Sequence, residues 1–227
     1  MSRSKRARIF VPGCFVLALL APTAARAGSI FIIETDTSPI LTHFGSGYTG
    51  YIDLQFNANA GADFATATIF GFSSDGSLSA PTYLTGDASG DLATTVTIGN
   101  GALDASGYND YNQAFTFGTF VKFEITLAGP ALNASGNTAG SAFSLSFYGS
   151  DDETNLLSTD LSGASAMLDI EPSGTVTPFT YAADDNNVYT KITAVPEPRS
   201  VLLLGAGVLL LAAGASIRFR RRTAQNR

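Results

Sequence analysis

The sequence predicts an all-β protein, an antiparallel β-sandwich with jelly-roll-like connections, and a closed barrel is the alternative. Three observations predict this class. Several stretches alternate apolar and polar residues with a period of two, as strands with one buried face do. The segments between them are rich in Gly, Asn, Asp and Ser, which favour turns. No stretch between residues 28 and 194 sustains the 3.6-residue periodicity of an amphipathic helix.

Nine strands are expected between residues 28 and 194. In chain order they cover residues 29–35, 51–57, 66–72, 92–98, 115–127, 143–147, 166–170, 176–181 and 188–193. In the second strand, Ile52, Leu54 and Phe56 alternate with polar residues. In the fifth, the apolar side chains from Phe115 to Leu127 share one face, and the fourth and sixth also alternate clearly. Turn-forming runs at residues 74–77, 86–90, 99–101 and 133–140 separate the strands.

Charge is distributed unevenly along the chain. The net charge is −6, but residues 28–194 contain only two basic residues, Lys122 and Lys191, against eighteen Asp and Glu, which gives this part −16. Nucleic acid and anionic membrane surfaces bind clustered Lys and Arg, so neither is an expected partner of this part. The one cysteine, Cys14, precedes it, so a disulfide and a thiolate metal ligand are both excluded there.

The first 27 residues predict a secretory signal peptide. Four basic residues among the first eight precede an apolar stretch, residues 9–21. Ala25 and Ala27 then give the small-x-small pattern that signal peptidase cleaves, and cleavage after Ala27 would make Gly28 the new N-terminus. The apolar stretch is short for a permanent membrane anchor. Residues 28–194 are therefore expected to form one exported domain.

The C-terminal 33 residues combine three features in order. The motif Val195-Pro196-Glu197-Pro198 comes first, and its prolines favour an extended chain. Residues 200–217 are uncharged, and a helix of this length spans about 27 Å, close to the thickness of a bilayer core. A basic tail, residues 218–227, follows and contains the membrane-stop residues Arg218, Arg220, Arg221 and Arg222. One interpretation is a plain membrane anchor behind a proline-containing linker.

In this order and at this place, the three features resemble the PEP-CTERM sorting domain of Gram-negative bacteria. The resemblance covers residues 195–222 and implies that an exosortase, a membrane-embedded transpeptidase-like enzyme, cleaves near the motif and removes the helix. It implies a precursor anchored in the inner membrane, then a protein at the cell surface or in the biofilm matrix. The implied partners are signal peptidase, exosortase and extracellular polysaccharide. Arg199 departs from the pattern, because a small residue is common there, and this bears on the efficiency of processing.

The body of the chain resembles known proteins more loosely. Residues 35–39, 50–57, 148–159 and 166–170 are similar to secreted bodies that carry such a tail. This similarity implies a shared sandwich architecture. It assigns no active site, since such bodies are generally of unknown function.

The residue types that perform catalysis do not form a recognisable set. His43 is the only histidine, so a zinc site with two or three histidines is excluded by count. The sequence contains neither a Gly-x-Ser-x-Gly nucleophile elbow nor a Walker-type phosphate loop. We therefore predict no catalytic residue and no enzymatic activity.

Two kinds of candidate binding residue remain. Calcium prefers oxygen ligands, and two acidic stretches offer them. The first is Asp151, Asp152 and Glu153 with Asn155, and the second is Asp184 and Asp185 with Asn186 and Asn187. Neither matches an EF-hand loop, and solvated acidic turns are the alternative. The same carboxylates are the candidates for a glycoside hydrolase pair. Tyr48, Tyr51, Tyr108 and Tyr111 could form a face that stacks against a sugar, and Tyr108 and Tyr111, in an Asn- and Asp-rich stretch, are the contacts named for it.

Three hypotheses for function follow. The first is a non-enzymatic exported surface or matrix protein that associates with extracellular polysaccharide and needs no cofactor. The second is a lectin-like module that recognises polysaccharide, with calcium as the metal it would use. The third is an extracellular hydrolase with a carboxylate pair.

Overall fold

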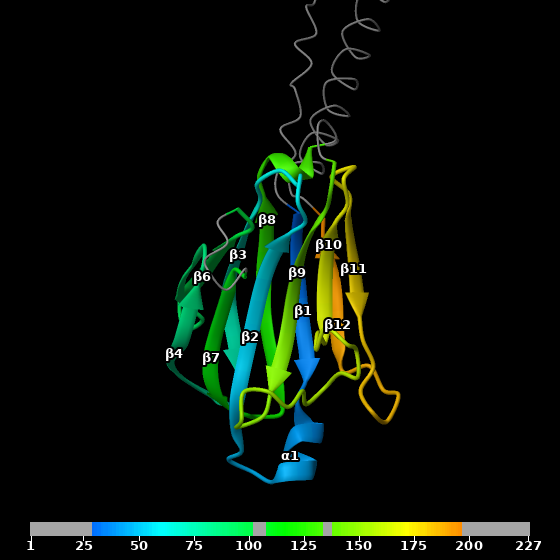
Figure 1. Ribbon diagram of the computed structural model, residues 1–227. Helices are drawn as coiled ribbons and strands as arrows, with labels where there is room; N and C mark the ends of the chain where they lie inside the picture. The colour runs from blue at the N-terminus through cyan, green and yellow to red at the C-terminus, as the bar shows by residue number, and fades with distance from the viewer. Residues whose placement is uncertain (1–28, 102–107, 134–137, 197–227) are drawn as a thin grey trace, which may run out of the picture.

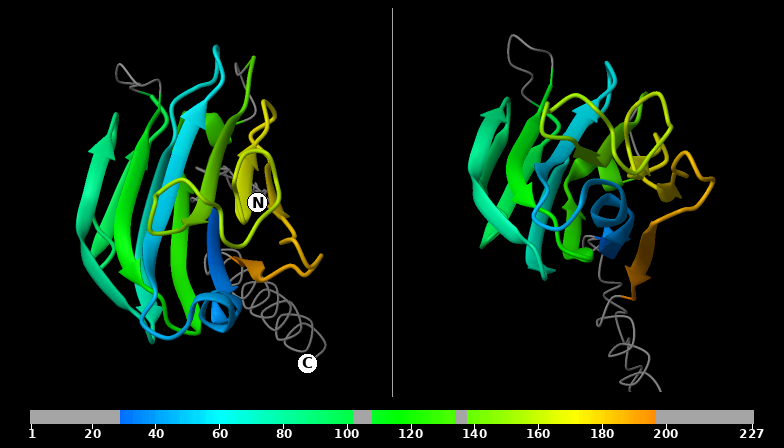
Figure 2. Two further views of the ribbon diagram at one scale, coloured as in Figure 1. Left: turned by 60° about the horizontal axis from the view of Figure 1, so that its bottom comes forward. Right: turned by 90° about the horizontal axis from the view of Figure 1, so that it is seen from below.

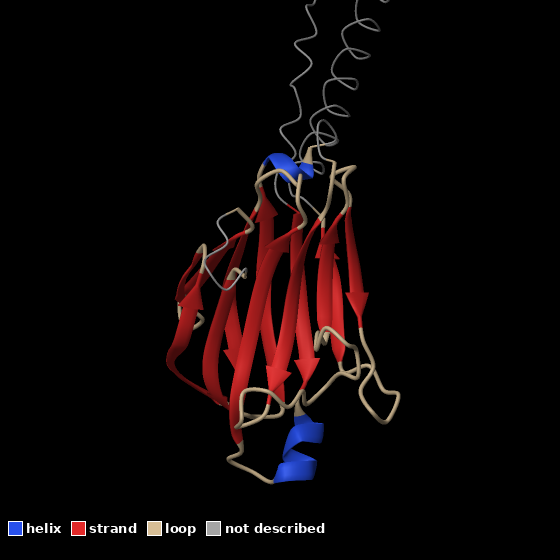
Figure 3. Cartoon of the chain, viewed as in Figure 1, coloured by secondary structure: helices blue, strands red, loops and turns tan. Residues whose placement is uncertain are grey.

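The computed structural model describes residues 29–101, 108–133 and 138–196 of the 227-residue chain. In this part, the chain forms twelve strands, one short α-helix and one 3₁₀-helix, η1 (Pro130–Leu132). The strands make two six-stranded antiparallel sheets that pack face to face, as Figure 1 and Figure 3 show. The predicted all-β antiparallel sandwich is therefore confirmed.

The first sheet, sheet A, has the strand order β12-β1-β8-β3-β6-β5. Its strands are β1 (Ser29–Asp36), β3 (Thr66–Ser74), β5 (Ala88–Asp91), β6 (Thr95–Gly99), β8 (Phe120–Ala128) and β12 (Thr190–Val195). The register of β1 and β12 places Ile30 opposite Val195 and Thr35 opposite Thr190. The first and last described strands are thus neighbours, and the two ends of the described chain lie at the same end of the sandwich.

The second sheet, sheet B, has the order β11-β10-β9-β2-β7-β4. Its strands are β2 (Thr49–Ala58), β4 (Ser77–Thr85), β7 (Asp110–Thr116), β9 (Ser141–Tyr148), β10 (Ala166–Ile170) and β11 (Val176–Thr180). On central strand β2, Asp53 lies opposite Asn112 of β7 and Ser146 of β9. Pro81 lies on edge strand β4, between two irregularities of the register, where a missing N–H is tolerated.

Side chains from the inner faces of both sheets fill the core. The largest buried rings are Tyr111, Phe56, Phe115, Phe123, Phe143 and Phe147. Phe72 of sheet A meets Phe115 of sheet B edge to face, with ring centroids 6.0 Å apart, so aromatic packing joins the two layers directly. Burying each such ring contributes about 2–3 kcal/mol. The period-two patterns of β2, β8 and β9 therefore supply much of this core.

Two predicted strands differ from the structure. The run 92–98 is a strand only from Thr95, because residues 92–94 form the turn between β5 and β6. The run 115–127 is two strands, β7 and β8, joined by a turn at residues 117–119. Asp75 holds this turn, because its carboxylate accepts hydrogen bonds from the backbone N–H of Thr119 (2.7 Å) and Phe120 (3.3 Å). The chain therefore reverses at a turn that is held by Asp75, more than 40 residues away in the sequence. The apolar residues on both sides of Gly118 keep the same alternation, so the sequence pattern does not reveal the end of β7.

Four elements were not expected, namely β4, β5, α1 and η1, and β5 occupies part of the predicted turn at residues 86–90. Strands β4 and β5 are mostly exposed or half-buried, so they lack the apolar alternation that marks a strand. Helix α1 (Ser38–Phe44) is too short for a visible helical period. It begins where the Asp36 carboxylate accepts hydrogen bonds from the N–H (2.9 Å) and hydroxyl (2.6 Å) of Ser38, and Pro39 fits the first turn.

No helix among the described residues is both long and apolar enough to cross a membrane. The predicted signal peptide and its cleavage site, Glu197 and Pro198 of the sorting motif, the helix at 200–217 and the arginine cluster all lie outside the described residues. They stay predictions.

Candidate functional site

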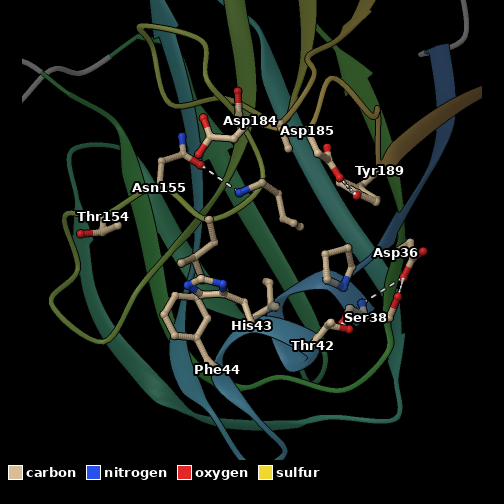
Figure 4. A pocket seen from close by; sticks show the side chains of 16 residues that line it. Asp36, Ser38, Thr42, His43, Phe44, Thr154, Asn155, Asp184, Asp185 and Tyr189 are labelled. Carbon is tan, nitrogen blue, oxygen red and sulfur yellow. Dashed lines mark hydrogen bonds between the residues drawn. The ribbon is translucent and has the colours of Figure 1, made fainter.

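A pocket of about 740 Å³ lies at the end of the sandwich where α1 meets the loops that follow β9 and β11. The right panel of Figure 2 looks onto this end, and Figure 4 shows the pocket from close by. Three segments far apart in the sequence form its walls, namely α1 with the residues just before it, residues 154–158 and residues 183–189. Tertiary structure alone brings them together.

Helix α1 forms the first wall and is fixed at both ends. Ile40 is buried in the core and anchors the helix. The helix ends at Gly45, whose φ of 92° suits glycine and whose N–H donates to the Leu41 carbonyl (2.9 Å). His43 and Phe44, in the last turn, both line the pocket and are both exposed.

The second wall is the loop after β9. The Asn155 side chain donates to the Gly163 carbonyl and accepts a hydrogen bond from the Leu157 N–H (3.3 Å). Leu157 is buried and holds the loop against the core. Thr154 and Asn155 therefore line the pocket from a fixed backbone (Figure 4), and their side chains are engaged in the loop's own hydrogen bonds, with the Thr154 hydroxyl donating to Asp151.

The third wall is the loop before β12. Its Asp185 carboxylate accepts hydrogen bonds from the N–H (3.0 Å) and side-chain amide (2.9 Å) of Asn187 and from the Tyr189 hydroxyl. The Tyr189 hydroxyl and the two Asn187 donors lower the pKa of Asp185. Thr159 joins the second and third walls, because its N–H donates to the Ala182 carbonyl (3.0 Å).

An aromatic group lies at the edge of the pocket. The ring of Phe44 stacks on Tyr48 with centroids 4.3 Å apart, and the His43 ring meets Phe44 edge to face at 4.4 Å. Phe44 is 45% exposed in spite of these contacts, so part of its surface remains free for a ligand. A ring held on one side and open on another is suited to packing against the apolar face of a sugar.

The charge of the pocket restricts its ligands. Asp36, Asp184 and Asp185 line it, and no Lys or Arg does. The two lysines of the described part, Lys122 and Lys191, lie on strands β8 and β12, and Lys122 pairs with Glu34. The pocket therefore disfavours anionic ligands and suits neutral ones with hydroxyl donors.

The two tyrosines predicted to bind sugar are not on a common surface. Tyr108 is 54% exposed, but Tyr111 is fully buried in the core. The Tyr111 hydroxyl accepts a hydrogen bond from the Leu92 N–H (3.0 Å) and donates to Gln113. The expectation for Tyr111 is therefore corrected, because a ring enclosed between the sheets cannot stack on a polysaccharide.

The acidic residues proposed for calcium are brought near the pocket but not into one site. Among residues 29–101, 108–133 and 138–196, no three His, Cys, Asp or Glu side chains are grouped to hold a metal ion. Asp151 accepts hydrogen bonds from its own loop, and those from the Thr154 hydroxyl and N–H lower its pKa to about 2. Asp152 turns toward sheet B, where it accepts a hydrogen bond from Asn112 (2.9 Å). Glu153 is exposed, and Asp184 and Asp185 lie on the opposite wall.

Sequence reasoning missed Phe44 and Tyr189, and it singled out Asn155 only as a calcium ligand, not as part of one site with them. Each lies in a segment without strand periodicity, and nothing in the sequence relates the three segments. One signal could have indicated helix α1: the sequence Asp36-Thr37-Ser38-Pro39, between the first two strands, has the residue types that are common at the start of a helix.

No family model matches the chain, and neither the curated proteins nor the solved structures compared with it give a significant match. The structure defines the class of the protein only as a sandwich of two antiparallel sheets, with an acidic pocket formed by α1 and two loops at one end.

Proposed function

We propose that this chain is an exported surface protein, sorted by an exosortase, whose jelly-roll-like sandwich binds extracellular polysaccharide without catalysing its hydrolysis. The sorting part of the proposal is supported by the order of motif, apolar stretch and arginines in residues 195–222. The predicted signal peptide at the other end agrees with it, because both signals require export.

The position of the pocket supports a binding role at a surface. Residue Tyr189 lines the pocket, and β12 then runs from Thr190 to Val195, the first residue of the motif. Six residues of extended chain at about 3.3 Å each place the start of the motif about 20 Å from the pocket. A sandwich attached through its C-terminal tail would therefore present the pocket away from the attachment point.

The single observation that carries the binding role is the composition of the pocket. It combines the partly exposed ring of Phe44 with the amide of Asn155 and the carboxylate of Asp184, over an apolar floor that includes Leu156. Ligand sites are typically concave and apolar with a few polar groups that fix orientation. Because the pocket contains carboxylates and no Lys or Arg, it disfavours acidic polysaccharides, and a polysaccharide without acidic groups is the ligand class that we propose.

The binding role can be tested by affinity electrophoresis in gels that contain dextran, a soluble β-glucan, mannan or, as the acidic probe, alginate. We expect at least one neutral polysaccharide to retard the protein and alginate not to retard it. Phe44→Ala should abolish the retardation. Phe179→Ala is the matched control, since Phe179 is a similarly exposed phenylalanine (43%) on edge strand β11, away from the pocket.

Two results would contradict this role. Retardation by none of the neutral polysaccharides would remove the support for a binding module. Release of reducing sugar that stops in an Asp184→Asn or Asp185→Asn variant would show a hydrolase instead.

The sorting role is tested by the intact mass of the protein recovered from the native cell surface and medium. We expect a C-terminus near Val195–Pro198, and any excess mass would reveal attached glycan or lipid. Replacement of Pro196, Glu197 and Pro198 by alanine should leave the tail in place. A mature protein that still contains Arg227 would refute exosortase processing and leave a plain membrane anchor.

A further inference from the structure

Strand β12 runs directly into the sorting motif. It ends at Val195, the first residue of the motif, and the next residue, Pro196, is exposed and belongs to no strand. Val195 lies opposite Ile30 in the register of β12 and β1. Among the described residues, which end at Pro196, no linker separates the folded sandwich from the motif. The motif therefore begins inside sheet A.

The backbone pairing of β12 with β1 extends to this last residue. At the other end of the pair, the Asp36 N–H donates to the Tyr189 carbonyl (2.9 Å), so these two opposite residues form a hydrogen-bonded pair. In an antiparallel ladder such pairs recur at every second residue. The pairs that Thr193 and Val195 form with β1 are therefore hydrogen-bonded as well.

Strand β12 is nevertheless the strand of sheet A that can leave at the lowest cost. It lies at the edge and pairs with β1 alone, whereas β1 also pairs with β8 along its whole length. Of the 6 residues of β12, Thr190 is buried, Ile192 and Val195 are half-buried, and the others are exposed. Detachment of β12 therefore exposes little apolar surface and leaves the other strands of sheet A paired.

A strand that is paired in a sheet is a poor substrate for cleavage. An enzyme that cleaves near the motif has to bind extended backbone before the cleaved bond, and the backbone N–H and C=O groups of Val195 are bonded to β1. Cleavage of a folded protein proceeds from its locally open form, so the rate follows the population of molecules in which the segment is open. The motif is thus accessible in proportion to the opening of β12.

We propose that the sorting enzyme cleaves the folded chain only while the end of β12, Thr193–Val195, is detached from β1. This inference rests on the proposed sorting function. Three detached residues supply about 10 Å of extended chain before Pro196, at about 3.3 Å for each residue. The pairing of β12 with β1 thereby limits the rate of processing, and the sandwich itself regulates its own release.

The test is the rate of cleavage of the folded full-length precursor, purified in detergent from cells that lack the sorting enzyme and incubated with membranes of the native cells. The release of the C-terminal fragment is followed by mass. About six Gly and Ser residues inserted between Ala194 and Val195 should raise the rate at least about tenfold, because the motif is then accessible while β12 stays paired. Thr193→Pro should raise it about fivefold, since proline removes the hydrogen bond that the Thr193 N–H donates to β1.

Ala194→Pro is the matched control. Ala194 is exposed like Thr193, but it lies opposite Phe31 between two hydrogen-bonded pairs. Its N–H therefore points to the open edge of the sheet, where proline is tolerated, and its rate of cleavage should equal that of the unaltered chain. In the chain with the insertion, neither proline should change the rate, which separates an effect on β12 from an effect on recognition of the motif.

The proposal is overturned if the insertion leaves the rate unchanged, or if Thr193→Pro and Ala194→Pro are cleaved equally fast. Either result leaves the sorting function itself intact, because the motif is still cleaved. If no chain is cleaved, the one with the insertion included, the sorting function is refuted and this inference with it.

Discussion

The Asp53–Asp110 pair should make the protein less stable as the pH rises. Burial raises the pKa of Asp110 from its ordinary 3.8 to about 6, and burial followed by the neighbouring Asp110 charge raises that of Asp53 well above the ordinary value. Between pH 4 and pH 6 the folded chain therefore holds a proton that the unfolded chain has lost. Because the folded state binds more protons, the free energy of unfolding falls through this interval.

The size of the effect follows from the shift of Asp110. Each pKa unit is worth about 1.4 kcal/mol, so a change from 3.8 to about 6 corresponds to about 3 kcal/mol over the whole titration. About 2 kcal/mol of this is lost between pH 4.5 and pH 8, because the unfolded carboxyl has already lost most of its proton at pH 4.5. Asp53 adds to the loss in the same direction. The lowered pKa values of exposed Asp151 and Asp185 act below this interval, so pH 4.5 is a suitable starting point.

The assay is urea unfolding at pH 4.5, 6 and 8 in EDTA, followed by far-UV circular dichroism. Asparagine resembles a protonated aspartate, so Asp110→Asn should match the unaltered chain within about 1 kcal/mol at pH 4.5. It should lose less than half as much stability by pH 8, and Asp53→Asn/Asp110→Asn together should remove most of the slope. A chain whose stability is constant or rises from pH 4.5 to pH 8 would refute the reasoning, as would an unaltered slope in Asp110→Asn.

Two further predictions concern the core and the backbone. Tyr111→Phe should lower the free energy of unfolding by about 1–2 kcal/mol, because two buried hydrogen bonds of the Tyr111 hydroxyl are lost and the Leu92 N–H keeps only its longer bond to Gln113 (3.3 Å). Polysaccharide retardation should not change. Reduced retardation of the Tyr111→Phe variant would contradict this prediction and would indicate that Tyr111 takes part in polysaccharide binding. Gly129→Ala should cost about 3 kcal/mol or more in the same urea assay, because φ is 125° and a Cβ would lie 2.7 Å from the Phe64 carbonyl oxygen. A loss below about 1 kcal/mol would show that the turn before η1 adapts.

Local periodicity predicted the strands that have one polar and one apolar face. In β2, the alternation of Ile52, Leu54 and Phe56 with polar residues placed the strand and indicated that Asp53 points away from the core. The same reasoning from alternation failed in β7, because Asp110 and Tyr111 face opposite sides of the sheet and are both buried. Both faces of that strand are covered, so the sequence carried no alternation to distinguish a core ring from a surface ring.

The sequence by itself determined the all-β class, most of the strand positions and the strongly acidic body, because each depends on residues close together in the chain or on composition. Only the tertiary structure decided that residues 38–44, 154–158 and 183–189 enclose one pocket, and that a loop covers Asp53 and Asp110. Strand pairing sets these juxtapositions, since β1 lies beside β12 and β2 between β7 and β9. Hydrogen-bond register joins residues far apart in the chain, and local patterns carry no information about it.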